Sequence, residues 1–289
     1  MRTIYKYHGL GNDFVVVEAD EPKAAPEDIR RICDRHRGVG GDGVILVCPP
    51  RRPEVDARMV IYNRDGTRPE MCGNGIRCVA RHLAEVQEIE APLVIESDAG
   101  LKECRFPARQ PGNWQVAVNM GQGRHASEPI DFSCRGDDRR FESVDVGNPH
   151  AITFGSAPIE TIDAFGEAMN APEAVPFGEG VNVEFVQQID ETTLEVVVFE
   201  RGVGRTEACG TGACATALAA WETGRAEQAP IDVHLPGGVL TVERDGEGDI
   251  WMTGPCRAVF SGRLAADWSG QLTSIELSDD PHQTEKTVQ

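Results

Sequence analysis

The sequence predicts an α/β (α+β) fold with two pseudo-symmetric domains, each a curved, mostly antiparallel sheet wrapped around a central buried helix. Two observations carry this prediction. The tetrapeptide Cys-Gly-x-Gly occurs twice, at residues 72–75 and 209–212, and the sequence around each copy recurs as well. A segment of helical composition follows each copy; the apolar residues of the second segment cover nearly its whole circumference, and a helix that is hydrophobic on all sides is buried.

Landmarks that return at a nearly constant spacing indicate an internal duplication. Coincidental matches would scatter in spacing, whereas loop insertions leave a drift of only a residue or two over a repeat. The first domain is expected over residues 1–115, completed by part of 264–280, the second over 116–263, and a frayed polar tail over 281–289. The recurring landmarks are Gly11-Asn12 and Gly147-Asn148, Gly43-Val44 and Gly180-Val181, Arg64 and Arg201, and Cys72 and Cys209.

The first half reads as strands that alternate with helices. Pro26 suits the first turn of a helix, and β-branched residues mark the strands that follow. In order, the predicted elements are a strand into a Gly-Asn turn over 3–17, a helix over 25–36, strands over 43–47 and 57–63, a helix over 76–86 and a hairpin over 91–106.

The second half repeats that order. Pro158 takes the place of Pro26, and Gly224 is suited to end the central helix as a C-cap residue. The predicted elements are a strand into a Gly-Asn turn over 141–154, a helix over 157–169, strands over 180–186 and 193–200, a helix over 213–224 and a hairpin over 229–245.

The composition excludes several classes of function. The formal net charge of −19 argues against nucleic acid or an anionic membrane surface as a partner. No apolar run approaches the roughly 18 residues that span a bilayer. Because the N-terminus also shows no signal peptide, we expect no membrane partner and a cytoplasmic location.

Two further site types are not expected. The nine cysteines include no Cys-x-x-Cys pair, so we expect reduced thiols and no metal site. The segment 37–43 (RGVGGDG) has the glycine spacing of a dinucleotide site, but it follows a helix and precedes a strand, which is the reverse of the required order.

Cys72 and Cys209 are candidate acid/base groups, because each lies where a strand ends and a buried helix begins. The N–H groups and the positive dipole end of a helix start favour a thiolate and lower a cysteine pKa from about 8.5 toward neutrality. The motif glycines let the backbone point N–H groups at a carboxylate. One copy alone would favour an inert thiol in a tight turn, whereas two copies favour function.

Two thiols on opposite faces of one α-carbon suit a single reaction. One thiolate removes the α-proton while the opposite thiol returns a proton, which inverts the centre. The two helix dipoles stabilise the carbanion charge on the carboxylate without a cofactor. The sequence therefore predicts a cofactor-independent amino-acid epimerase.

Polar residues at strand ends are candidates for substrate binding. An asparagine after glycine is often only a turn residue, and this reading stays open for Asn12 and Asn148. Asn182 interrupts a strand-like run, where an amide needs a partner. Arg201 can clamp a carboxylate while Glu200 accepts from an ammonium. The candidates are Asn12, Asn63, Asn148, Asn182, Glu200 and Arg201.

Six motifs, in this order over nearly the whole chain, resemble those of diaminopimelate epimerase, which interconverts L,L- and meso-diaminopimelate without a cofactor. They are HGLGNDF, YNRDG, MCGNGIRC, GNPH, GVNVEF and FERGVGRTEACGTGACA. The resemblance implies the two-domain diaminopimelate epimerase-like fold, a role in lysine biosynthesis and a homodimer.

The same resemblance assigns roles to residues. Cys72 and Cys209 are implied as the acid/base pair, and His150 and Glu200 as side chains that poise the thiols. The six polar candidates are implied to hold diaminopimelate. The implied donors to its α-carboxylate are the backbone N–H groups of Gly73, Asn74, Gly210 and Thr211.

The chain departs from the family pattern at three positions. Gly43 stands where many relatives carry a glutamine, and Arg205 and Glu207 stand where an acidic and an uncharged residue are expected. Two alternatives remain. A proline or hydroxyproline racemase uses the same two-thiol chemistry, but its motifs differ from Asn74 and from the pair formed by Glu200 and Arg201. A thiol redox switch is the other alternative.

Overall fold

The computed structural model describes residues 3–69, 71–174, 177 and 180–269. Within these residues the chain divides into two compact units. Unit 1 holds the residues up to Val116 and from Cys256 onward, and unit 2 holds Ala117–Pro255. The expected frayed tail over 281–289 lies outside the described residues.

The boundary expected at residue 263 requires a correction. Strand β18 (Arg257–Arg263) pairs antiparallel with β1 (Thr3–Gly9), with Thr3 opposite Arg263. Residues 256–263 therefore belong to unit 1. Leu264 and Trp268, the latter in α5 (Ala266–Ser269), pack against the core of the same unit.

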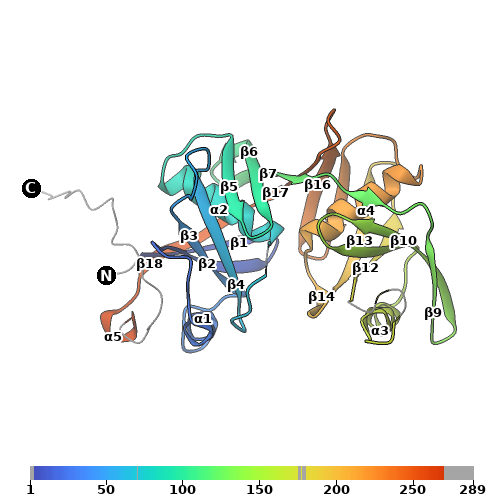
Figure 1. Cartoon of the computed structure of the whole chain (residues 1–289), viewed down its shortest axis with the longest axis horizontal. Helices are drawn as coiled ribbons and strands as arrows, with labels where there is room; N and C mark the ends of the chain where they lie inside the picture. Colours follow the sequence, from blue (N-terminus) through green and yellow to red (C-terminus); the bar gives the residue numbers. More distant parts are fainter. Residues whose placement is uncertain (1–2, 70, 175–176, 178–179, 270–289) are drawn as a thin grey trace, which may run out of the picture. The chain divides into compact units, whose positions relative to one another are not determined.

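Unit 1 is a mixed sheet around a helix. The sheet order is β18, β1, β2, β3, β4, β5, β6; the pairs β2–β3 and β4–β5 are parallel and the others antiparallel. Figure 1 shows these strands curving around α2. The strands not yet bounded are β2 (Asn12–Glu18), β3 (Gly43–Cys48), β4 (Ala57–Asn63), β5 (Leu93–Ser97) and β6 (Gly100–Gln110).

Side chains on the two faces of one strand in unit 1 pack against two different helices. In β3, Val44 and Leu46 belong to the core cluster beneath α1 (Pro26–Cys33). Ile45 points the other way and approaches Gly75 in α2 (Gly73–Val86). Side chains alternate between the faces of a strand, so one buried strand serves two helices. All six residues of β3 are buried.

Unit 2 repeats this arrangement. β10, β11, β12, β13, β15 and β16 follow the same alternation of antiparallel and parallel pairs as β1 to β6, with α3 (Ile159–Met169) and α4 (Gly210–Glu222) in the places of α1 and α2. The strands are β10 (Asp137–Asp145), β11 (Pro149–Phe154), β12 (Asn182–Gln188), β13 (Thr193–Glu200), β15 (Ile231–Leu235) and β16 (Gly238–Arg244).

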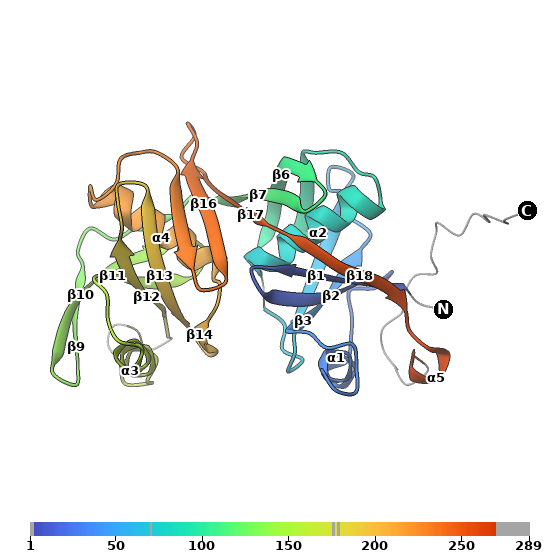
Figure 2. The same cartoon turned by 180° about the vertical axis from the view of Figure 1, so that it is seen from behind.

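Shorter or peripheral strands complete the sheets. β8 (Arg124–His125) and β9 (Ile130–Cys134) pair with β10, β14 (Gly204–Thr206) pairs with β13, and β17 (Ile250–Pro255) pairs with β16. β7 (Asn113–Gly121) carries the chain from residues of unit 1 into residues of unit 2. Figure 2 shows β18 alongside β1 from the other side.

The predicted fold class is confirmed, and the helix boundaries shift for a physical reason. Both central helices begin three residues earlier than predicted, because the thiols themselves cap them. α4 is buried along nearly its whole length, as predicted, and Gly224 follows its end at φ +66. α2 is also largely buried, and its buried residues include Arg77 and His82.

Candidate active site

Cys72 is the N-cap residue of α2. Its backbone is extended, and its Sγ accepts a hydrogen bond from the N–H of Gly75 at 3.4 Å. This geometry is that of a capping side chain, with sulfur in place of the usual oxygen. Gly73 and Asn74 occupy the first helical positions, whose N–H groups have no acceptor within the helix. The thiol thus lies beside donors suited to an anion.

A buried guanidinium supports this loop from inside unit 1. Nη2 of Arg77 donates to Oδ1 of Asn74 at 2.7 Å, and Nη1 donates to the carbonyl of Gly73 at 3.1 Å. Because its oxygen is occupied by Arg77, the amide of Asn74 turns its nitrogen to Oδ1 of Asn12 at 3.2 Å. Arg77 therefore sets the direction of both amides.

Asn12 completes the half-site of unit 1. Its Oδ1 also accepts from the thiol of Cys72 at 3.8 Å, and its Nδ2 donates to the carboxylate of Asp42 at 3.3 Å. Asn63 is placed differently. It is exposed at the end of β4, and its Nδ2 donates to Oγ1 of Thr67 within its own turn at 3.0 Å.

Cys209 occupies the corresponding position in unit 2. It is the N-cap residue of α4, and its Sγ accepts from the N–H of Gly212 at 3.4 Å. Gly210 opens the helix, and Oγ1 of Thr211 lies 3.5 Å from the sulfur. The thiol is 5% exposed. The two halves of the duplication therefore place a thiol in the same capping role.

The expected lowering of the thiol pKa is wrong for Cys209. Burial raises its pKa well above the ordinary value, and the charges of Glu200 and Glu184 raise it further. The hydrogen bonds from Thr211 and Gly212 oppose this shift but are outweighed. Loss of hydration and two neighbouring carboxylates thus exceed the effect of the helix start. In the free site Cys209 holds its proton.

Glu200 is a carboxylate whose charge raises the pKa of the Cys209 thiol. Burial raises its pKa and the charge of Glu184 adds to the shift, while hydrogen bonds from Thr206 and Cys209 favour the charged form. Oγ1 of Thr206 donates to Oε1 of Glu200 at 2.5 Å. Glu200 therefore faces the thiol as a hydrogen-bonded partner.

His150 connects the loop of Cys209 to the sheet. Its Nε2 lies 3.1 Å from Oδ1 of Asn148, and Nδ2 of Asn148 donates to Oγ1 of Thr211 at 3.3 Å. On the other side, Nδ1 of His150 lies 2.7 Å from Oε1 of Glu184. Glu184 is not among the residues predicted from the sequence. Its signal was a charged residue two positions after Asn182, on the same face of a strand-like run.

Asn182 and Arg201 meet at the end of β13. The amide of Asn182 accepts from the backbone N–H of Arg201 at 3.0 Å and donates to the carbonyl of Pro149 at 3.2 Å. This buried amide bonds to two backbone groups, so it fixes the strand ends that carry the site. The side chain of Arg201 is exposed.

The structure shows the surroundings of the three positions at which the chain departs from the family pattern. A Cβ on Gly43 would meet the carbonyl of Tyr62 at 2.5 Å, so no side chain fits there without a backbone shift. Arg205 is paired with Asp163 on α3 at 2.6 Å. Glu207 accepts from the N–H of Gly237 through its backbone carbonyl.

The other thiols behave as small core side chains. All nine cysteines are free, as predicted, and seven of them are buried. Burial raises the pKa of Cys33 and Cys48 to about 11 and that of Cys104 to about 12. Among the described residues, no group of three or more His, Cys, Asp or Glu side chains is arranged to hold a metal ion. Within the same residues, no helix is long and apolar enough to span a membrane.

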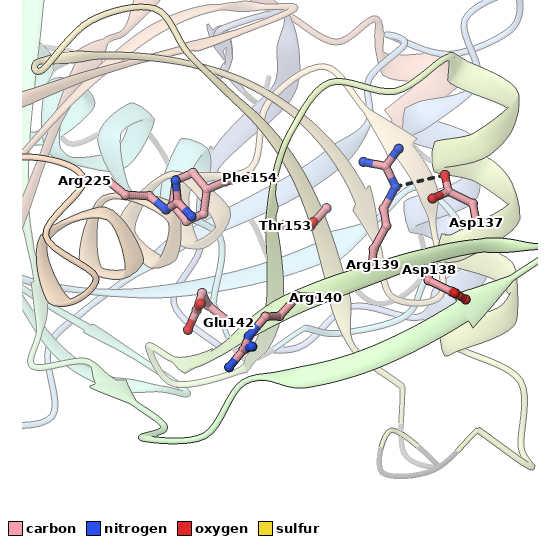
Figure 3. Close-up of a pocket in the computed structure, with 8 residues that line it drawn as sticks. All are labelled: Asp137, Asp138, Arg139, Arg140, Glu142, Thr153, Phe154 and Arg225. Atoms are coloured by element: carbon pink, nitrogen blue, oxygen red, sulfur yellow. Dashed lines mark hydrogen bonds and ion pairs between the residues drawn. The ribbon is translucent and has the colours of Figure 1, made fainter.

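A separate hollow of about 400 Å³ lies on unit 2 (Figure 3). Nε of Arg139 contacts Asp137 at 3.0 Å, and the guanidinium of Arg225 lies 4.3 Å from the ring centre of Phe154. None of the predicted site residues lines it. The lining residues are Asp137, Asp138, Arg139, Arg140, Glu142, Thr153, Phe154 and Arg225.

Comparisons with solved structures show the same fold. A hydroxyproline epimerase from Agrobacterium vitis matches with a TM-score of 0.68 at 18% identity, over 97% of this chain and 95% of that one. A phenazine biosynthesis protein from Bacillus anthracis matches with a TM-score of 0.69 at 16% identity, over 91% of this chain and 99% of that one.

Comparisons of sequence are closer. A diaminopimelate epimerase from Alkalilimnicola ehrlichii is 40% identical over 283 residues, which cover 91% of this chain and 98% of the relative. A diaminopimelate epimerase from Synechocystis is 39% identical, over 89% of this chain and 97% of the relative. The family profile described as diaminopimelate epimerase matches residues 4–126 and 142–259. The chain therefore belongs to the diaminopimelate epimerase family.

Proposed function

We propose that this protein interconverts L,L- and meso-diaminopimelate, as an isomerase of lysine biosynthesis that needs no cofactor. The observation that carries the proposal is the pair of thiols, Cys72 and Cys209, each of which caps the central helix of its unit. Membership of the family supports the substrate.

The proposed reaction proceeds in two proton transfers. The thiolate of one cysteine takes the α-proton, and the electron pair of the C–H bond remains on the substrate as a carbanion that is delocalised into the carboxylate. The thiol of the other cysteine gives its proton to the opposite face, which inverts the centre. After one turnover the protonation states of Cys72 and Cys209 are exchanged.

The electrostatics of Cys209 support a protonated starting state for this thiol. Because Cys209 lies among buried carboxylates, it holds its proton in the free site. Cys209 is therefore the proton donor in the first turnover, and Cys72 is the base. The reverse reaction starts from the exchanged state, in which substrate must stabilise a thiolate at Cys209.

The remaining predicted residues take binding roles in this proposal. N–H groups at the two helix starts hold the α-carboxylate, where the helix dipoles stabilise its growing negative charge. His150 and Glu200 poise the thiol of Cys209. The donors at the helix starts are Gly73, Asn74, Gly210 and Thr211, and the side chains that hold substrate are Asn12, Asn63, Asn148, Asn182, Glu200 and Arg201.

Deuterium uptake tests the reaction directly. Purified protein and L,L-diaminopimelate are incubated in D₂O without added cofactor. We expect meso product with deuterium at the inverted α-carbon, detected by mass spectrometry and chiral chromatography. L-Proline and trans-4-hydroxy-L-proline serve as control substrates. Inversion of either control without inversion of diaminopimelate would replace the proposal with a racemase of the proline type.

A homodimer in the cytoplasm is proposed as the working form. β18, which pairs with β1, exposes Val259 and Phe260, which are 56% and 47% exposed. Exposed apolar side chains gathered on one strand favour association with another chain. The nine free thiols suit a reducing compartment. Sedimentation velocity of wild-type protein and Phe260→Glu tests the assembly, with a monomeric wild type as the contrary result.

A further inference from the structure

The pair formed by His150 and Glu184 is completely buried in unit 2. Both side chains are 0% exposed, and Nδ1 of His150 lies 2.7 Å from Oε1 of Glu184. The second carboxylate oxygen of Glu184, Oε2, is buried without a hydrogen-bond partner. A buried carboxylate with an unused oxygen is costly, so its position needs a compensating role.

The hydrogen-bond directions around His150 specify where its protons are. Nδ2 of Asn148 donates to Thr211, so Oδ1 of Asn148 faces the imidazole and can only accept. Nε2 of His150 must therefore carry a hydrogen. Because Nδ1 faces a carboxylate, a further proton lies between Nδ1 and Glu184.

Oε1 of Glu184 lies beside the start of α4. A Cβ placed on Gly212 would lie 2.8 Å from Oε1 of Glu184 and 3.4 Å from Sγ of Cys209, so both atoms border the same point in the first turn of the helix. The positive end of a helix dipole stabilises an anion there. With Glu184 ionised, the shared proton resides on His150, which becomes an imidazolium.

We propose that Glu184 is a positioning residue that holds His150 as the imidazolium, which in turn fixes the amide of Asn148 and, through Thr211, the loop of Cys209. The proposed effect on catalysis rests on the function proposed above. The proposed protonation of His150 does not depend on that function. Without the carboxylate, a neutral imidazole has one N–H for two acceptors, and the amide of Asn148 is free to reverse.

Titratable groups from several neighbouring elements surround the pair formed by His150 and Glu184. His150 extends from β11, Glu200 from β13 and Cys209 from the start of α4; Asp145 on β10 also interacts with the charge of His150. The carboxylates of Glu200 and Glu184 both disfavour a thiolate at Cys209.

Nuclear magnetic resonance of protein labelled with ¹⁵N-histidine tests the protonation state at neutral pH. The signal of His150 is assigned by its loss in His150→Gln. We expect both ring nitrogens of His150 to carry protons in wild type and in Glu184→Asp, and only one in Glu184→Gln. A neutral His150 in wild-type protein would overturn the proposal, whether or not the protein is an epimerase.

The matched control is a second His–Glu pair of the same unit, His125 and Glu142, whose ring and carboxylate lie 2.9 Å apart at 15% and 16% exposure. We expect Glu142→Gln to leave kcat unchanged. We expect Glu184→Gln to lower kcat about 10- to 100-fold with a smaller change in KM. Equal effects of the two variants would contradict a positioning role.

If wild-type protein does not epimerise diaminopimelate, the proposed function is wrong. The NMR experiment still tests the protonation of His150 in that case. Because Glu184→Gln could also disturb folding, each variant is first compared with wild type by thermal unfolding. Glu184→Asp keeps the charge on a shorter chain. Partial recovery of kcat in this variant supports the charge requirement, and no recovery at unchanged stability opposes it.

Discussion

The N–H of Gly212 donates to Sγ of Cys209 at 3.4 Å, and the space beside that glycine is filled by a carboxylate oxygen of Glu184. The equivalent bond in unit 1 joins Gly75 to Cys72 at the same distance, but there the neighbouring atoms are the terminal methyl groups of Ile45 and Ile61. The two capping loops are therefore alike in backbone and opposite in surroundings.

This contrast predicts unequal effects of alanine at the two glycines. In Gly212→Ala the new Cβ would lie 2.8 Å from the Glu184 carboxylate, which must move within a packed site. We expect a loss of about 1–3 kcal/mol in unfolding free energy and a clear fall in kcat. In Gly75→Ala the contacts of 3.1 and 3.3 Å involve flexible side-chain ends, so stability should change by about 1 kcal/mol or less. Denaturant unfolding and epimerisation assays of the two variants measure the difference, and a milder effect at Gly212 would refute the argument.

Serine separates the two roles of each thiol. Cys72→Ser and Cys209→Ser keep a side chain that caps the helix well but remove a group able to exchange protons near neutral pH. We expect unfolding midpoints close to wild type and epimerisation reduced by at least about 10³-fold in each variant. Chiral chromatography of the product measures inversion. Retained activity in either variant would remove that thiol from the acid/base pair.

The protonation of Cys209 can be followed by alkylation. Because burial, then Glu200 and Glu184, raise its pKa, reaction with iodoacetamide should be slow at pH 7 and increase with pH beyond the usual thiol range. Glu200→Gln removes one of the charges that disfavour the thiolate, so the rate profile should shift to lower pH. Peptide mass spectrometry reports the rate at Cys209 itself. An unshifted profile in Glu200→Gln would show that the charge of Glu200 does not contribute to the pKa of Cys209.

We expect substitution of Arg77 to lower both stability and activity. It is completely buried and donates to both Gly73 and Asn74. Arg77→Lys keeps the charge but cannot donate to both groups in the same planar geometry. We expect a loss of about 2–4 kcal/mol in unfolding free energy and a fall in kcat, because the amides of Asn74 and Asn12 lose their fixed direction. Arg51→Lys, in the same unit but with a side chain 59% exposed and paired with Glu96 at 3.3 Å, is the control and should change little.

Much of the fold could be predicted because the duplication supplies each element twice. Cys72 and Cys209 were placed at helix starts from the glycine pattern, and the structure puts both at the N-cap. The pairing of β18 with β1 was missed, because it joins segments at opposite ends of the chain and leaves no local pattern. Arg77 was missed for a similar reason, since one arginine in a helix usually points to solvent.

The chemistry of the candidate site could be predicted from the sequence only in part. A helix start alone predicts a lowered thiol pKa, but the pKa of Cys209 is set by burial and by Glu200 and Glu184, which arrive from different strands. The position of Asn182 opposite His150 in the parallel ladder, with Glu184 two residues further on, brings these side chains together. Such register is a tertiary property that spacing along the chain does not contain.

The placement of β18 beside β1 also bears on how the chain matures during synthesis. Unit 2 is one continuous stretch, Ala117–Pro255, and leaves the ribosome whole, while the first unit to be translated still lacks its last strand. Domains that are complete early fold early. Unit 1 can therefore complete its sheet only after unit 2 has been translated, and β1 lacks this partner strand until β18 follows.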